Sequence, residues 1–87
     1  MSIAVTEFGF VELRRWMRER KMTLAAFEQR SGVDRNTVWR LLHGQRPEIG
    51  VLIVDKLSVA TEGAIGIDQA RAYEKRQALH RRAMRAA

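Results

Sequence analysis

The stretch SGVDRNTVWRLLHG, residues 31–44, decides the fold. Within it Val38, Leu41 and Leu42 are spaced i, i+3 and i+4, so they share one face of a helix. Asp34 is a favoured N-cap residue immediately before that helix, and the closing glycine is suited to ending it. The other face carries long side chains with hydrogen-bonding ends: Arg35, Asn36, Trp39, Arg40 and His43. The stretch therefore predicts a helix with one buried face and one outward polar face.

A shorter helix is expected just before this one. Thr23 is suited to capping a helix over residues 24–30, and Gly32 stands where that helix would end in a left-handed conformation. Two helices joined by so short a turn cross steeply, and the inner face of the second holds it out from the domain. Its outer face is then free to enter a DNA major groove about 12 Å wide, where arginine pairs with guanine and asparagine with adenine.

The rest of the chain also favours helices. We expect a first helix over residues 9–21 with Gly9 as N-cap, and it buries Phe10, Leu13, Trp16 and Met17. After a loop at residues 45–47, a helix over residues 48–61 is expected. Its buried candidates are Ile49, Leu52, Ile53, Leu57 and Ala60. Ile65 and Ile67 then form a short apolar return segment. Asp68 caps a final helix, whose less polar positions are Ala70, Tyr73 and Leu79.

Length and composition narrow the function. Eighty-seven residues make one small domain, too small for most enzymes with a deep pocket, and no cysteine is present for a disulfide or thiolate metal site. Two distant histidines, His43 and His80, are a poor basis for zinc, and no cofactor or small-molecule ligand is indicated. No motif pairs two carboxylates, or a nucleophile with a base, so we expect no enzyme.

Charge points to a polyanion. The net charge is +6, the sequence pI is about 11.1, and thirteen of the sixteen basic residues are arginine, whose flat fork suits phosphate and guanine. An arginine bias also arises in genomes rich in G and C, so the charge alone does not name the polyanion. The chain has neither a signal-peptide pattern nor an apolar run that could cross a membrane, so we expect a cytoplasmic protein without a membrane partner.

A family resemblance rests on LRRWMRERKMTLAAFEQRSGVDRNTVWRLLHGQRP, residues 13–47, which resembles the helix-turn-helix of the Cro/CI-type (XRE-like) phage repressors. The matching residues are Met22, Thr23, Phe27, Gly32, Val33, Thr37, Val38, Arg40, Gly44, Arg46 and Pro47. The resemblance covers residues 10–62, and residues 57–67 are further similar to the small Cro and YdaS-like prophage regulators. It implies an all-α, lambda-repressor-like bundle of about five helices that contains a helix-turn-helix.

The resemblance also implies roles for individual residues. Base contacts fall on Arg35, Asn36 and Arg40; phosphate contacts fall on Thr23, Leu24, Thr37, His43, Gln45 and Arg46. Leu24 departs from the family, which usually has glutamine there, so that contact would come from Thr23 or from backbone N–H groups. Trp39 stands where a small or polar residue is usual. It joins the base-contacting set as a wedge against a sugar or a thymine methyl, with a protein contact as the alternative.

Together these observations predict a regulator that binds double-stranded DNA and represses genes of a phage, prophage or mobile element as a homodimer on an inverted repeat. Residues 1–67 would form the DNA-binding domain, and the last two helices the dimer surface. Residues 68–87 form a basic helix that is solvated, contacts phosphate or dimerises. For His43, a helix-end cation is as good an explanation as a phosphate contact.

Other interpretations stay open. The polar face could simply be solvated. The scaffold could also serve protein interaction, as in an antitoxin or an RNA polymerase adaptor. An interaction module would tolerate loss of Arg35 and Arg40 and depend on apolar surface such as Trp39 or Tyr73, whereas a DNA reader would behave the other way round.

Overall fold

The computed structural model describes the backbone of residues 9–86 and the side chains of residues 9–83. Residues 1–8, where the signal-peptide pattern was sought, lie outside the described residues, as does the side chain of Arg85 in the basic C-terminal run. Between residues 9 and 86 the elements are all helices: α2 Val11–Glu19, α3 Leu24–Ser31, α4 Arg35–Leu42, α5 Val51–Ala60 and α6 Ile67–Ala86. The predicted all-α architecture of about five helices is confirmed.

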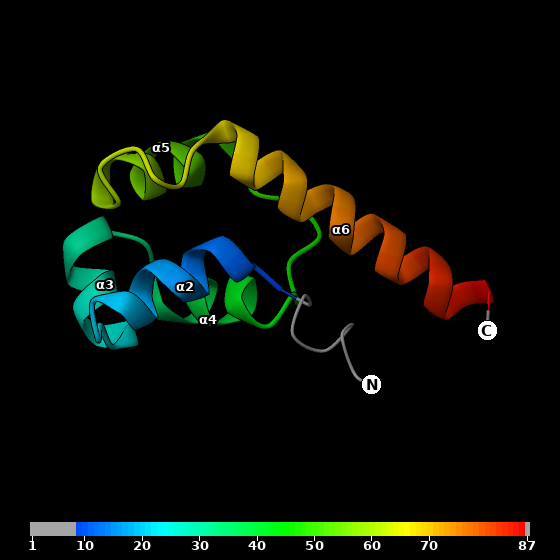
Figure 1. Ribbon diagram of the computed structural model, residues 1–87, viewed down its shortest axis with the longest axis horizontal. Helices are drawn as coiled ribbons and strands as arrows, with labels where there is room; N and C mark the ends of the chain where they lie inside the picture. Colours follow the sequence, from blue (N-terminus) through cyan, green and yellow to red (C-terminus); the bar gives the residue numbers. More distant parts are fainter. Residues whose placement is uncertain (1–8, 87) are drawn as a thin grey trace.

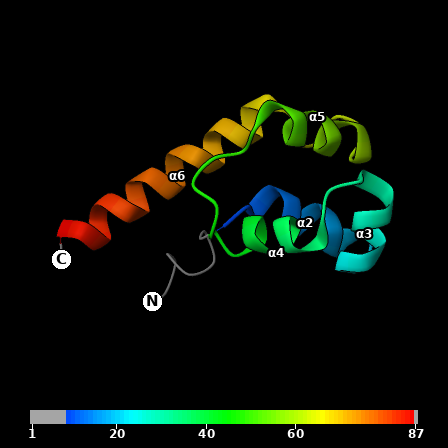
Figure 2. The ribbon, with the colours of Figure 1, turned by 180° about the vertical axis from the view of Figure 1, so that it is seen from behind.

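The helices enclose one hydrophobic core. Helices α2, α3 and α4 lie together, α5 lies across from them, and the long α6 begins beside α5 and runs outward to the C-terminus (Figures 1 and 2). The predicted buried residues of α2 are confirmed, as are Val38 and Leu41 of α4, whereas Leu42 is only partly buried against the core. Trp16 packs edge-on against Phe27 of α3 at 5.9 Å between ring centroids. The core comprises Phe10, Leu13, Trp16, Met17, Phe27, Val33, Val38, Leu41, Ile49, Val54, Leu57, Ala60, Ile65, Ala70 and Tyr73.

The first half of α6 belongs to this core. The buried Tyr73 stacks on Phe10 with 5.0 Å between ring centroids, and its hydroxyl donates to the Arg46 carbonyl at 2.6 Å. The buried Gln77 donates from Nε2 to the Gly44 carbonyl at 2.8 Å and accepts from the Gly9 N–H at 3.3 Å. Helix α6 therefore fixes the loop after α4 and the start of α2 in place. The predicted division of the chain at residues 67 and 68 stays a prediction.

Two predicted helix starts are wrong. Helix α2 is preceded by Phe10 as N-cap, and Gly9 instead has φ +90° against the Leu42 carbonyl, where a Cβ would collide. The helix predicted from residue 48 begins only at Val51, after Gly50. The reason is tertiary: the Ile49 N–H donates to Glu74 Oε2 of α6 at 2.7 Å, so Ile49 is buried in the loop rather than in a helix.

The C-terminal half differs from expectation in three further ways. Leu52, predicted to be buried, is 78 % exposed, and Val54 takes the inward position instead. Ile65 is buried as expected, but Ile67 is the first residue of α6 and is exposed. Asp68 lies inside α6 rather than capping it: the Gly66 N–H donates to Gln69 Oε1 at 2.8 Å, which is half of a capping box.

Candidate nucleic-acid interface

The turn between α3 and α4 is built from local signals. Thr23 Oγ1 accepts the Ala26 N–H at 3.1 Å at the start of α3, and Asp34 accepts the Asn36 N–H at 2.9 Å at the start of α4. Gly32 ends α3 at φ +77°, a conformation that suits glycine because it lacks a Cβ. The predicted caps and turn are thus confirmed. They hold α4 with Val38 and Leu41 wholly inside.

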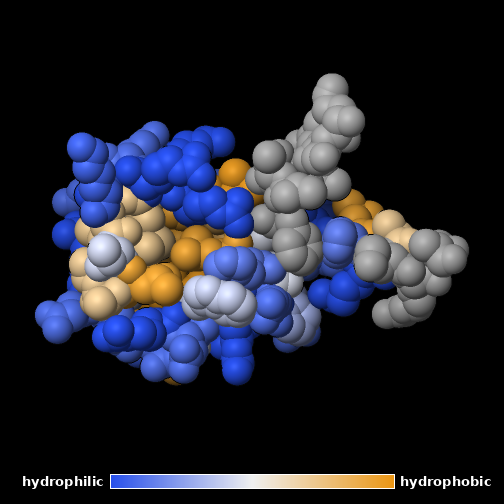
Figure 3. Space-filling view, turned by 90° about the horizontal axis from the view of Figure 1, so that it is seen from below, coloured by the Kyte–Doolittle hydropathy of each residue, from blue (hydrophilic) through white to orange (hydrophobic). Residues whose placement is uncertain are grey.

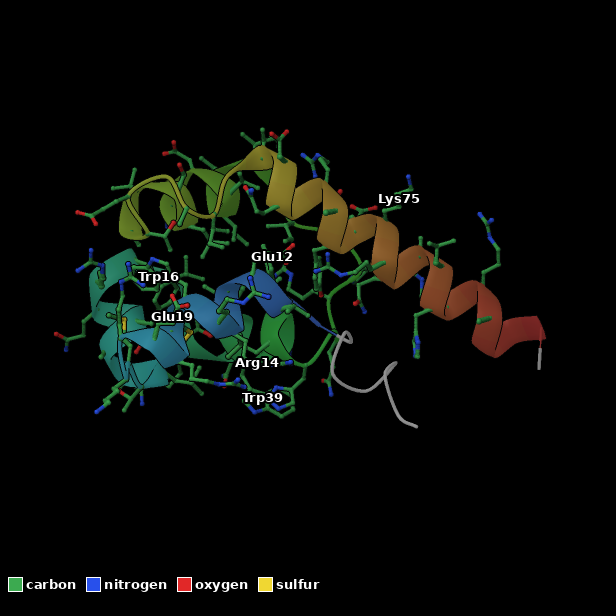
Figure 4. All side chains as sticks on the ribbon, in the orientation of Figure 1. Glu12, Arg14, Trp16, Glu19, Trp39 and Lys75 are labelled. Carbon is green, nitrogen blue, oxygen red and sulfur yellow. The ribbon has the colours of Figure 1, made fainter. Side chains whose placement is uncertain are left out.

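All four predicted base-contacting residues lie on the outward face of α4. Arg35, Asn36, Trp39 and Arg40 are all exposed, and Thr37 beside them is half-buried. Trp39 lies at the lower edge of the molecule, below Arg14 of α2 (Figure 4). Figure 3 shows this lower side, where hydrophilic side chains cover much of the surface with apolar patches between them. The fold therefore brings these side chains together on one exposed helix face.

Arg35 is tied to a residue that sequence reasoning missed. Glu28 of α3 accepts the Arg35 backbone N–H at 3.1 Å with Oε2, and with Oε1 it accepts Nε–H at 3.0 Å and meets Nη2 at 2.9 Å. The backbone bond, with the guanidinium second, lowers the pKa of Glu28 below its usual value. The partners are seven residues apart and lie on different helices, so no i, i+4 spacing predicts the pair from the sequence.

Trp39 and His43 form a stacked pair one helical turn apart. Their ring centroids are 4.1 Å apart with planes inclined by 24°, and His43 Nδ1 lies 2.8 Å from the Trp39 carbonyl. Because a carbonyl only accepts, Nδ1 must carry the proton in this contact. Nε2 is then the ring nitrogen that remains for a further contact. Trp39, at 40 % exposure, thus presents an aromatic edge whose orientation His43 restricts.

The predicted phosphate-contacting residues are spread around the ends of α3 and α4. Thr23 and Gln45 are exposed, while Leu24 is half-buried and packs against the core. Arg46 is half-buried, and its Nε donates weakly to the Glu48 carbonyl at 3.4 Å. The Leu24 side chain has no polar atom, so at this end of α3 only Thr23 and backbone N–H groups can meet an oxyanion.

A basic row on α2 adjoins these residues. Arg14 donates from Nη2 to the Leu42 carbonyl at the end of α4. With Arg15 and Arg18 it lines a shallow hollow of about 230 Å³. The contact with the Leu42 carbonyl places Arg14 beside the C-terminal end of α4.

The comparison with protein families decides what this arrangement is. A model of the Cro/C1-type HTH DNA-binding domain matches residues 12–61, more than half of the chain. The chain belongs to this Cro/C1-type family. No curated protein and no solved structure is significantly similar to it.

Membership makes this chain a DNA-binding regulator of the Cro/C1 type, and the five helices of residues 9–86 form the lambda-repressor-like bundle that the resemblance implied. The matched residues run from the first turn of α2 to the residue after α5. Among the described residues no three histidine or acidic side chains are grouped as a metal site would require. Within the same residues no helix is long and apolar enough to cross a membrane.

Proposed function

We propose that this protein is a small Cro-like repressor that binds an inverted-repeat operator as a homodimer. The observation that carries the proposal is the outward face of α4, which gathers Arg35, Asn36 and Arg40 opposite the buried Val38 and Leu41. Bound at its operator, it would block RNA polymerase by occlusion. Its targets would be genes of a phage, prophage or mobile element, and it would act in the cytoplasm.

The residues divide into base readers and phosphate clamps. Arg35 and Arg40 each present a fork that matches O6 and N7 of guanine, and Asn36 matches N6 and N7 of adenine. Trp39 would press its ring edge on a sugar or a thymine methyl. The phosphate clamps are Thr23, Leu24 through its N–H, Thr37, His43, Gln45 and Arg46. Clamps fix the register of α4 in the groove, whereas the readers supply the sequence preference.

The dimer would use α5 and α6. Val51, Leu52 and Val59 leave 72, 78 and 73 % of their surface exposed on one short helix. Clustered exposed apolar side chains mark protein contacts more often than isolated ones do. Two copies would place their α4 helices about 34–36 Å apart, one turn of B-DNA. The basic end of α6 would extend the dimer contact or reach phosphates.

The test is selection of randomised duplex DNA by the purified protein at about 150 mM salt, near physiological ionic strength. Recovery of an inverted repeat supports a dimeric sequence-specific reader and identifies the operator. Sedimentation of the protein with that operator then gives the number of chains bound. Recovery of DNA without any preferred sequence contradicts the proposal, because only the sequence-independent charge attraction would remain.

The apolar face of α5 favours a second candidate, an interaction module such as an antitoxin or an RNA polymerase adaptor. Such a module depends on apolar surface and tolerates loss of Arg35 and Arg40. Tyr73, which we named as one residue for this role, is buried and cannot serve it. The exposed Leu52 replaces Tyr73 as the apolar residue to test. A pull-down of a partner protein that survives Arg40→Ala but fails with Leu52→Asp favours the interaction module.

A further inference from the structure

Both carboxylate oxygens of Glu28 contact Arg35. Oε2 accepts the backbone N–H of Arg35, and Oε1 faces both Nε and Nη2 of the same residue at 3.0 and 2.9 Å. Glu28 is partly covered, with 29 % of its side chain exposed, whereas 55 % of the Arg35 side chain is exposed. An exposed arginine at the start of α4 thus contacts one carboxylate through both its backbone N–H and its guanidinium.

Glu28 does not contact the edge of the Arg35 guanidinium that could bond a base. Arginine has five N–H donors in a planar fork, and Glu28 occupies the side formed by Nε and one hydrogen of Nη2. Nη1 and the second hydrogen of Nη2 form the other edge. Two parallel donors of that kind are what O6 and N7 of guanine accept. The ion pair therefore orients the fork without using the edge that would meet a base.

We infer that Glu28 is a positioning residue that sets the base preference of Arg35, an inference that rests on the proposed DNA-reading function. A restrained arginine loses less side-chain freedom on binding and has fewer ways to bond the wrong base. The carboxylate also offsets the charge of Arg35 close to the phosphates. Glu28 thus strengthens binding to the matching site and weakens the attraction to DNA of any sequence.

A purely structural role for Glu28 is the competing explanation. Arg35 is the first residue of α4, and its N–H lacks a partner within the helix, so Glu28 also helps to cap α4. Asp34 provides the matched control, because it is another acidic residue that caps the same helix end, through the Asn36 N–H. No bond from Asp34 to the Arg35 guanidinium occurs among the described residues. Asp34→Asn and Glu28→Gln each remove one negative charge and keep an oxygen that can accept.

The experiment compares wild type, Glu28→Gln, Asp34→Asn, Arg35→Ala and the Glu28→Gln/Arg35→Ala double variant. Each is titrated by fluorescence anisotropy with the selected operator, with versions altered at the base pair that Arg35→Ala identifies, and with random duplex. Glu28→Gln is expected to lower discrimination at that base pair about tenfold and to bind random duplex more tightly. Asp34→Asn is expected to gain random-duplex affinity to the same extent but to keep its discrimination. In the Arg35→Ala background, Glu28→Gln should change discrimination no further.

A measurement without DNA tests the Glu28–Arg35 pair itself. In ¹⁵N NMR spectra, the Arg35 Nε–H signal should be protected from exchange in wild type and in Asp34→Asn, and lose that protection in Glu28→Gln. Equal discrimination in wild type and Glu28→Gln, or an equal loss in both acidic variants, overturns the inference while the proposed function stands. A wild-type protein without base preference overturns the proposed function, whatever the NMR signal shows.

Discussion

The outward faces of α4 and α5 make opposite use of the same packing rule. Each helix buries one side in the common core and turns the other to solvent. The outer side of α4 carries Arg35, Asn36 and Arg40, which water solvates well. The outer side of α5 carries Val51, Leu52 and Val59, which water solvates poorly, with the charged Asp55 and Lys56 beside them. Core formation explains the inner faces of both helices and neither of the outer ones.

This difference indicates two kinds of partner. A polar face rich in arginine gains by meeting a polyanion, whereas an apolar face gains by being covered with protein. Helix α5 lies across the core from α4 (Figures 1 and 2), so DNA seated on α4 would leave α5 accessible. The two faces can therefore be occupied at the same time, and each can be tested alone.

The largest effect is expected at Tyr73, which packs α6 against the helices that carry the two outward faces. Tyr73→Ala removes a buried ring stacked on Phe10 and should lower the free energy of unfolding by about 3–5 kcal/mol. Tyr73→Phe removes only the hydroxyl that bonds the Arg46 carbonyl and should cost about 1 kcal/mol. Urea denaturation followed by circular dichroism measures both. Equal costs would mean that the ring contributes nothing to joining α6 to the rest.

The next effect concerns the apolar face. Leu52→Asp places a charge on the proposed dimer surface and should weaken dimerisation by about 2–4 kcal/mol, with the monomer's stability nearly unchanged, because Leu52 is exposed. Sedimentation equilibrium measures the change. Leu79→Asp, at a leucine of α6 that is 54 % exposed, tests the other helix of the proposed dimer surface: whichever variant releases monomers locates the contact. Dimers that survive both changes would place the dimer surface elsewhere.

A smaller effect separates base reading from phosphate clamping on the polar side. Arg40→Ala should cost about 1–3 kcal/mol on the operator and relax the preference at one base pair per half-site. Arg46→Ala should weaken operator and random duplex alike and reduce the slope of log affinity against log salt by about one unit. Salt titrations on both duplexes measure the two responses. Identical behaviour of the two variants would contradict the division between base-reading and phosphate-contacting residues.

Sequence reasoning succeeded where the physical signal is local. Thr23 and Asp34 cap helices with their own side chains, and Gly32 supplies a left-handed turn, so a few neighbouring residues specify each feature. The buried stripes of α2 and α4 follow from helical spacing for the same reason. These features are also the ones that place the outward face of α4.

It failed where distant residues decide. The start of α5 depends on Glu74, which takes up the Ile49 N–H from 25 positions along the chain. Helix α5 is apolar on nearly every side, so periodicity could not separate Leu52, which is outside, from Val54, which is inside. The Glu28–Arg35 pair was missed for a related reason: the partners lie on different helices and meet only because of the turn between them.

The smallest effect is the pH dependence of that pair. Because Arg35 bonds the carboxylate in the folded state, the pKa of Glu28 lies below its ordinary value of 4.5. A lowered folded-state pKa stabilises the fold at pH values above the unfolded-state pKa, and this contribution is lost as pH falls through the folded-state pKa. Wild type should therefore lose its advantage over Glu28→Gln as the pH falls from neutral to well below 4.5, the ordinary pKa of the group. Urea unfolding of both proteins across this range measures it. Since a glutamine cannot titrate, a difference that stays constant with pH would show that the bond to Arg35 does not depend on the carboxylate charge. The restraint on the outward face of α4 would then be geometric rather than electrostatic.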